Sequence, residues 1–367
     1  MRRAALVMLL LLGGCLRQAE GRADGDLDVG TATAGGVSVV AAGGLAHVRD
    51  SQSGALRLWA LAPVVDLTLT PGANAEPEWL ITIQNVLADA RLTAVSGAVV
   101  EPVSRPRPTM GVWKVTLSAG TPARLRLAPP DADRPGPYRF AVMSDIQTAL
   151  DRVDQVFAKI DAEPGVRFVA SAGDIVQRGQ RWEYDLFEQQ LETLDVPYYS
   201  TIGNHELIGN PALWRDRFGR FNVHFAFKGV YFSMVDSGSA TIDPIVYDWL
   251  DDWMDEARGA PHLFFTHIPP IDPIGVRQGS FRSRNEAAKL LSRLANGEVA
   301  LTIYGHIHSY YDFQNAGIPA RISGGGGAWP EKFDGIGRHF LVIDVDPARA
   351  DEPGGGVVSI DVVRVDQ

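Results

Sequence analysis

Residues 301–310, LTIYGHIHSY, join a short apolar run to two histidines that are one residue apart. The run LTIY has the length and composition of a buried β-strand. Because side chains alternate along an extended chain, His306 and His308 can point in the same direction just beyond that strand. Two imidazoles on one side could each hold a metal ion, or they could be ordinary polar residues at a strand end. The pair alone does not decide between these interpretations.

Four further strand-like runs end in residues that can bind metal. They are YRFAVMSDIQ (138–147), VRFVASAGDIVQRG (166–179), VPYYSTIGNHE (196–206) and HLFFTHIPP (262–270). In open α/β sheets, ligands bind at the carboxyl ends of the strands. We therefore expect the polar residues at these ends to meet in one metal site, which consists of Asp145, Asp174, Asn204 and His267 together with the histidine pair.

Segments with helical periodicity lie between these runs, at residues 151–162, 247–257 and 283–297. The last one carries a capping box that begins at Ser283 and a terminal Gly297. Strands that alternate with helices predict an α/β domain, which we place at residues 138–367. The short apolar runs of residues 37–128, separated by Gly, Pro, Asn and Asp, predict a small β-sandwich domain before it.

The first fifteen residues, MRRAALVMLLLLGGC, have the features of an export signal: two arginines, then an apolar run too short to span a bilayer. LGGC resembles a bacterial lipobox, in which the cysteine is lipidated. The alternative is an ordinary cleaved signal with an incidental Cys15. Both interpretations predict an exported protein, and lipidation predicts a periplasmic or outer-membrane-anchored lipoprotein. Residues 16–36 are small and polar and are expected to form a flexible tether.

Composition limits the partners. The 367-residue chain has a formal net charge of −10, and we find no Lys/Arg run after residue 3. A nucleic-acid polymer is therefore not expected as a partner, because it requires many phosphate-neutralising cations. A small phosphorylated substrate stays possible, since bound metal ions add positive charge. Nothing in the sequence predicts a protein partner.

The order GD…GNHE…H…GHxH resembles the calcineurin-like metallophosphoesterases over residues 138–346. The resemblance implies a four-layer α/β/β/α sandwich with two metal ions at the strand ends. It implies that Asp145 and His308 bind one ion and that Asp174 bridges the two. Asn204, His267 and His306 would bind the other ion, and His205 would act near the leaving group as an electrostatic or general-acid residue.

Two metal ions at such a site, about 4 Å apart, clamp a phosphate and give a bridging hydroxide near neutral pH. The sequence departs from the family's usual Asp-x-His at Gln147, which either ligates through its amide oxygen or leaves a position for water. An amide oxygen is a harder ligand than imidazole, which favours Mn²⁺ or Mg²⁺ over Zn²⁺, with Fe also compatible. Arg178 partly matches an arginine that holds phosphate in Ser/Thr protein phosphatases, but it is equally compatible with a solvated loop.

The expected function is therefore an exported, metal-dependent phosphatase or phosphodiesterase. The alternative is a non-catalytic surface lipoprotein, in which the β-domain binds a partner and the phosphoesterase domain has lost its activity. Gln147 is the main support for that alternative, whereas the intact Asp174 and His205 argue against it.

Overall fold

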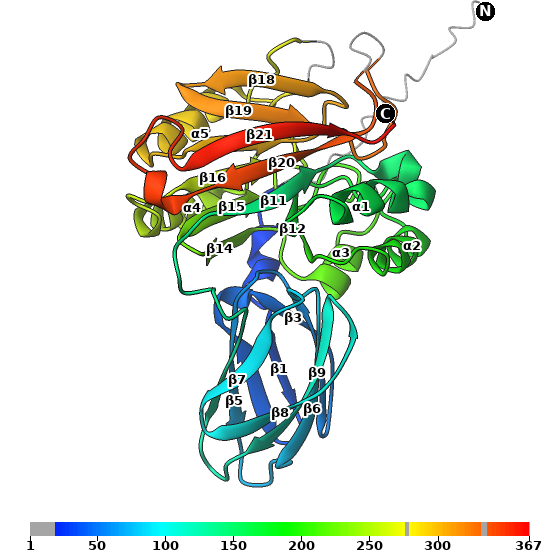
Figure 1. Cartoon of the computed structure of the whole chain (residues 1–367), viewed down its shortest axis with the longest axis vertical. Helices are drawn as coiled ribbons and strands as arrows, with labels where there is room; N and C mark the ends of the chain where they lie inside the picture. Colours follow the sequence, from blue (N-terminus) through cyan, green and yellow to red (C-terminus); the bar gives the residue numbers. More distant parts are fainter. Residues whose placement is uncertain (1–18, 276–278, 332–335, 367) are drawn as a thin grey trace, which may run out of the picture.

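The computed structural model describes residues 19–275, 279–331 and 336–366. The signal segment with Cys15 lies outside the described residues. Two five-stranded sheets make up the first part of the chain, and a five-stranded and a six-stranded sheet with helices beside them make up the rest (Figure 1). Among the described residues, no helix is long and apolar enough to cross a membrane.

The N-terminal part is a β-sandwich, as expected. Buried and more exposed residues alternate along several of its strands, as in Val37–Ala41 and Met110–Leu117, which shows that these strands turn one face to a shared core. One sheet has the strand order β1 (Thr31–Ala34), β2 (Val37–Ala41), β5 (Val65–Pro71), β10 (Ala123–Ala128) and β7 (Arg91–Ser96). The other has the order β3 (Ala46–Gln52), β4 (Ala55–Ala60), β6 (Glu78–Gln84), β9 (Met110–Leu117) and β8 (Ala98–Arg107).

The C-terminal part contains two mixed sheets with helices beside them (Figure 1). One sheet has the order β13 (Tyr198–Ser200), β12 (Val166–Ser171), β11 (Tyr138–Met143), β20 (His339–Val345) and β21 (Val357–Arg364). The other has the order β14 (Val223–Phe227), β15 (Val230–Val235), β16 (His262–Thr266), β17 (Leu301–Tyr304), β19 (Ile318–Ser323) and β18 (Tyr310–Asn315). The helices are α1 (Asp154–Asp161), α2 (Arg181–Leu191), α3 (Ala212–Phe218), α4 (Pro244–Glu256) and α5 (Arg284–Asn296), and short 3₁₀ turns are η1 (Ala23–Asp26), η2 (Ala42–Gly44), η3 (Gln147–Arg152) and η4 (Pro347–Arg349).

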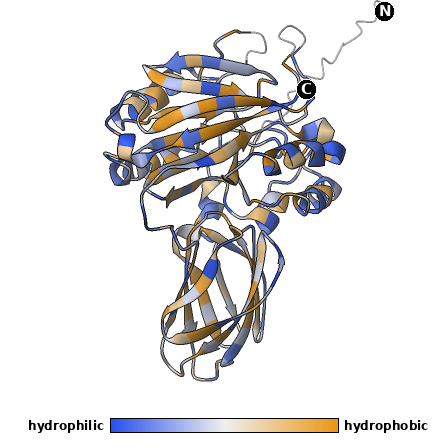
Figure 2. Ribbon diagram, viewed as in Figure 1, coloured by the Kyte–Doolittle hydropathy of each residue, from blue (hydrophilic) through white to orange (hydrophobic). Residues whose placement is uncertain are grey.

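Strand β16 shows why the layers stack as α/β/β/α. Its residues are all buried, and they alternate between two cores. Leu263 and Phe265 belong to the core between the two sheets, whereas Phe264 packs with residues of α4 and α5. A strand that is covered on both faces has a nearly continuous run of apolar residues, as at residues 263–265 here. Figure 2, coloured by hydropathy, shows that apolar and hydrophilic residues are interspersed along the strands and helices.

The predicted helices are present. The capping box at the start of α5 is confirmed: the Ser283 side chain accepts a hydrogen bond from the Glu286 N–H at 3.2 Å, and Gly297 follows the last helical residue. In α1, the apolar face that the periodicity predicted is fully buried, and Val156, Phe157 and Ile160 belong to the same core as residues of β11 and β12.

The predicted flexible tether is wrong for residues 19–36. This segment contains the 3₁₀ turn η1 and the strand β1. The Asp26 carboxylate is buried and accepts hydrogen bonds from the N–H groups of Phe221 (3.0 Å) and Asn222 (2.9 Å). Small polar residues suggested a solvated chain, but here the polar groups of η1 find partners in the C-terminal part, and β1 pairs with β2.

The β-sandwich is attached to the α/β layers by specific polar contacts. The buried Asn85 side chain pairs with the backbone of Tyr198 in edge strand β13, accepting from its N–H at 2.7 Å and donating to its carbonyl at 2.9 Å. Arg49 donates to Glu188 at 2.9 Å and to the Arg217 carbonyl at 2.6 Å. Buried donors and acceptors that are matched in this way fix the relative position of the two parts.

Candidate metal centre

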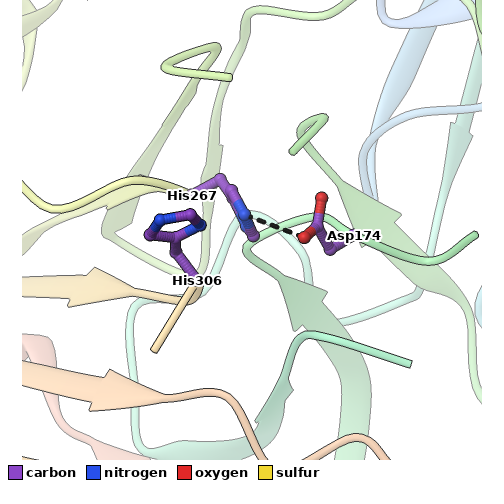
Figure 3. A group of neighbouring side chains, drawn as sticks. All are labelled: Asp174, His267 and His306. Atoms are coloured by element: carbon purple, nitrogen blue, oxygen red, sulfur yellow. Dashed lines mark ion pairs between the residues drawn. The ribbon is translucent and has the colours of Figure 1, made fainter. Parts of the chain in front are cut away.

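The strand-end residues predicted from the sequence do converge. Parallel strands β11 and β12 place Asp145 and Asp174 at the same edge of one sheet. Parallel strands β16 and β17 place His267 and His306 at the corresponding edge of the other sheet. Three of these side chains, Asp174, His267 and His306, have ligand atoms that all lie within 4.8 Å of one another (Figure 3).

Asp174 lies between two groups of donors. On one side, its Oδ2 is 3.1 Å from His267 Nε2. Asn204 extends that group, because its Oδ1 lies 3.0 Å from His267 Nε2 and 2.9 Å from His306 Nδ1. These four residues are the set that the family resemblance assigned to one metal ion.

On the other side of Asp174 lie Asp145, Gln147 and His308. The Oδ1 of Asp145 is 3.4 Å from His308 Nε2. The Gln147 Nε2 atom is 2.7 Å from Asp174 Oδ2, 3.2 Å from His308 Nε2 and 3.5 Å from Asp145 Oδ1. The end of the Gln147 amide therefore lies among the ligand atoms, and a half-turn of the amide would bring its oxygen to the same place.

Backbone carbonyls orient two of the histidines. His267 Nδ1 is 2.9 Å from the carbonyl oxygen of Ala172, and His308 Nδ1 is 2.7 Å from that of Trp329. Donation from Nδ1–H leaves the Nε2 lone pair of each ring directed at the cluster. This is the usual arrangement of histidines that bind metal.

The charge balance of the cluster favours a cation. Asp145 and Asp174 are fully buried, and each is paired with histidine. Burial raises the pKa of Asp145, but the hydrogen bond with His308 and the charges of His267 and His308 outweigh it, so the net pKa lies below the ordinary value. Burial lowers the pKa of His267, but the charge and hydrogen bond of Asp174, together with other nearby carboxylates, more than offset this and raise it to about 9. Buried anions need compensating positive charge, which divalent cations would supply.

His205 lies at the edge of the cluster. Its side chain is 21% exposed, and Nε2 is 3.9 Å from Asp174 Oδ2. Nδ1 donates to the carbonyl oxygen of Gln177 at 2.6 Å, which leaves Nε2 facing the site. Arg178 directly follows Gln177. Its backbone N–H donates to the Glu183 carboxylate, and its side chain is exposed. A role for Arg178 in binding substrate stays a prediction.

Glu206 is a residue of the site that sequence reasoning missed. The side chain is fully buried and accepts hydrogen bonds from the N–H groups of Asp174 (3.0 Å), Val176 (3.1 Å) and Gly203 (2.6 Å). Burial and the charge of Asp174 raise the pKa of Glu206 to about 8. All three partners are nevertheless N–H donors, and only an ionised carboxylate can accept all three hydrogen bonds without an O–H group of its own to place. We therefore infer that Glu206 is ionised in the folded protein. Glu206 thus ties the Asp174 loop to the Asn204 loop.

The glycine-rich segment SGGGGAWP, residues 323–330, lies against the site. The Gly326 N–H donates to the Ser144 carbonyl, and the Ala328 N–H donates to the Asp145 carbonyl, both at 2.8 Å. The sequence did not reveal that this segment holds both the Asp145 backbone and, through the Trp329 carbonyl, the His308 ring.

The site also contains strained backbone. Asp145, Gln147, Asp174 and His306 have φ values of 62°, 44°, 56° and 68°, in the left-handed region that favours glycine. Such conformations cost roughly 1–2 kcal/mol per residue and concentrate at functional sites. Gly203 is required for a different reason: a Cβ atom there would lie 2.1 Å from Asp174 Oδ1.

Comparisons with known proteins agree with this site. The family model for calcineurin-like phosphoesterases matches residues 138–310. Over 161 residues the chain is 26% identical to the probable glycerophosphodiester phosphodiesterase GpdQ of Arcobacter nitrofigilis. That match covers 40% of this chain and 58% of the relative, so the chain spans little more than half of the relative's length.

Solved structures give distant likenesses. A dimetal phosphatase from Danio rerio is 15% identical, with a TM-score of 0.46, and the match covers 62% of this chain and 99% of that one. The PhoD structure is 9% identical, with a TM-score of 0.46, and the match covers 78% of this chain and 83% of that one. The order of motifs, the strand-end geometry and the family model agree: residues 138–310 are a calcineurin-like phosphoesterase domain.

Proposed function

We propose that the protein is a metal-dependent hydrolase of phosphoric esters with a dinuclear centre. The observation that carries this proposal is the position of Asp174, whose carboxylate lies between two sets of donors on two different sheets. One set is Asp145, Gln147 and His308, with Gln147 binding through its amide oxygen. The other set is Asn204, His267 and His306.

The residues present fit divalent cations. They combine buried carboxylates, amide oxygens and imidazoles, two of which are oriented by backbone carbonyls at Nδ1 so that Nε2 faces the cluster, which suits Mn²⁺, Fe, Zn²⁺ or Mg²⁺, with Mn²⁺ favoured by the amide ligands. Two such ions would supply positive charge to the phosphoryl oxygens and lower the pKa of a water molecule to near neutrality.

The protein's own groups then orient the reaction. Asp174 and Glu206 hold the two ligand loops at a fixed separation, which reduces the reorganisation needed in the transition state. His205, fixed by the Gln177 carbonyl, presents Nε2 to the opening of the site. From there the imidazole can donate a proton to, or stabilise charge on, the leaving oxygen, a contribution of typically 10²–10⁴-fold.

Turnover by metal-depleted protein reloaded with Mn²⁺ tests this function, with p-nitrophenyl phosphate and bis(p-nitrophenyl) phosphate as substrates. We expect Mn²⁺-dependent hydrolysis of at least one ester. His205→Asn keeps a donor for the Gln177 carbonyl and removes Nε2, so kcat should fall by about 10²-fold or more while metal content is unchanged.

The matched control is His47→Gln. His47 lies in strand β3 of the β-sandwich, outside the metal cluster. Its Nε2 atom is 3.0 Å from the Asp216 carbonyl oxygen, and a glutamine amide can make the same contact. We expect wild-type turnover from this variant. A wild-type protein that binds two metal ions and hydrolyses neither these esters nor a phospholipid would contradict the proposal and favour the non-catalytic lipoprotein.

We also propose that the protein is exported and anchored to a membrane by a lipid on Cys15. The sequence MRRAALVMLLLLGGC supports this, because its apolar run is followed by a lipobox-like LGGC. A single acyl chain anchors weakly, and two or more anchor stably, so a fully lipidated cysteine would hold the protein at the membrane.

A further inference from the structure

The described chain begins beside the loops that carry the metal ligands. Arg22 Nε donates to Asp236 Oδ2 at 2.6 Å, and Arg22 Nη1 donates to Ser239 Oγ at 2.8 Å. Both partners belong to the loop after β15. The first described residues are thus fixed to the end of that strand, at the same edge of the sheet as the ends of β16 and β17.

The loop after β15 in turn touches two ligand loops. The Ile268 N–H donates to Ser237 Oγ at 2.7 Å, and Ile268 directly follows His267. Gly238 packs on the Gly203 carbonyl, where an added Cβ atom would lie 2.7 Å away, and Gly203 directly precedes Asn204. One layer of residues therefore separates Arg22 from the candidate metal centre.

Three loops around the centre expose large apolar side chains. Ile208, three residues after His205, is 59% exposed. Ile271 and Ile274 follow His267 and are 45% and 41% exposed. Trp329 is 76% exposed, although its carbonyl is bonded to His308. Single exposed apolar residues are normal, but their recurrence on three loops of one site indicates contact with an apolar partner.

An apolar groove leads away from one of these loops. It has a volume of about 780 Å³ and runs between the loop after His267 and helix α5. Most of its lining is apolar, including Ile271, Phe281 and Leu291, with Asp272 and Arg284 at the end nearer the site, and it reaches Ala316 near the other end of α5. A helix of 13 residues is ~20 Å long, so the groove can take an extended hydrocarbon chain whose head lies near the centre.

We propose that the site faces a phospholipid membrane and that its substrate is the phosphoester head group of a membrane lipid. The exposed apolar side chains, Ile208, Ile271, Ile274 and Trp329, enter the lipid surface, and an acyl chain lies in the α5 groove. The proposal rests on the proposed hydrolase function. It also uses the proposed lipid on Cys15: Cys15 is seven residues from Arg22, at most ~25 Å in an extended chain, so that lipid would hold the loop after β15, to which Arg22 is bonded, near the membrane.

The test compares lipid and soluble substrates with the full chain loaded with Mn²⁺. Vesicles of phosphatidylcholine and phosphatidylglycerol are the lipid probe, and release of water-soluble phosphorylated head group is the readout. Bis(p-nitrophenyl) phosphate and p-nitrophenyl phosphate are the soluble probes. We expect wild-type protein to hydrolyse the vesicle lipid, and to have a lower KM for long-chain than for soluble short-chain phospholipid with the same head group.

In the triple variant Ile208→Ser, Ile271→Ser, Ile274→Ser, hydrolysis of vesicle lipid should be at least ten-fold slower than in the wild type. Hydrolysis of the soluble esters should stay within about two-fold of the wild-type rate. Retained soluble turnover shows that this variant is folded. The matched control replaces three valines of the β-sandwich that are exposed to a similar degree, Val95, Val99 and Val103 (64%, 61% and 55%), with serine. We expect both activities of that control to be unchanged.

Soluble-ester hydrolysis without release from vesicles would overturn the membrane substrate and leave the hydrolase function in place. Equal lipid turnover by the wild type and the isoleucine variant would overturn the role of the exposed side chains. Failure to hydrolyse any of the esters would instead contradict the hydrolase function itself.

Discussion

Glu206 should hold the metal centre together, and its replacement by glutamine is expected to weaken both stability and metal binding. Its Oε2 accepts from the N–H groups of Asp174 and Gly203, and its Oε1 accepts from Val176. In Glu206→Gln, one oxygen becomes an NH₂ group that faces a backbone donor. At least one buried N–H then loses its acceptor, and the remaining bonds lose their charge assistance.

The magnitude follows from these contacts. An unsatisfied buried donor costs about 1–3 kcal/mol, and the loss of charge from the other bonds adds roughly 1 kcal/mol, so we expect the free energy of unfolding to fall by about 2–4 kcal/mol. Because Glu206 sets the spacing of the Asp174 and Asn204 loops, Mn²⁺ affinity should fall by about 10–100-fold, as for other residues that orient metal ligands.

Urea unfolding and Mn²⁺ titration by calorimetry measure the two effects. Asp26→Asn is the matched control, because Asp26 is also buried and accepts from two backbone N–H groups, those of Phe221 and Asn222. It should lose a similar free energy of unfolding without a change in metal affinity. Equal metal affinity in wild type and Glu206→Gln would refute the reasoning.

Three other predictions follow from particular residues. Gln147→His should shift the selectivity of one metal site from Mn²⁺ towards Zn²⁺, because imidazole is softer than an amide oxygen; identical selectivity in competitive titrations would show that Gln147 is not a ligand. Burial lowers the pKa of His262 to about 3. Because the pKa of His262 in the folded protein lies below the ordinary value of 6.5, neutral His262 stabilises the fold above pH 6.5. This contribution is lost as the pH falls below 6.5. Between pH 7 and pH 5 the loss should be roughly 2 kcal/mol, and urea unfolding of His262→Gln should show a pH dependence smaller by that amount; an unchanged pH dependence would refute the assignment. Cys15→Ala should release the protein from membranes into the soluble fraction, and retention of this variant after a high-salt wash would contradict the lipid anchor.

Much of the candidate site could be predicted because its ligands follow strand ends. Asp145, Asp174, His267 and His306 each come directly after an apolar run, and the parallel pairing of those runs brings them together. That inference requires only the strand pattern and the rule that ligands bind at carboxyl ends. The order of the motifs then indicated which family to expect.

The residues that support the ligands could not be found in this way. Glu206 binds backbone N–H groups of two loops, and the Trp329 carbonyl binds His308 from 21 residues away. These contacts depend on how loops pack and leave no periodicity in the sequence. The error over residues 19–36 has the same origin, since the Asp26 carboxylate is buried by partners almost 200 residues further along the chain.

The account depends most on two metal ions that share Asp174. Crystals of the protein grown with Mn²⁺ and measured at the manganese absorption edge locate these ions directly. We predict two anomalous peaks, one on each side of the Asp174 carboxylate, the first beside Asp145 and His308 and the second beside His267 and His306. Crystals of Asp174→Asn should lose one or both peaks. A single peak, or peaks that do not contact Asp174, would contradict the dinuclear centre.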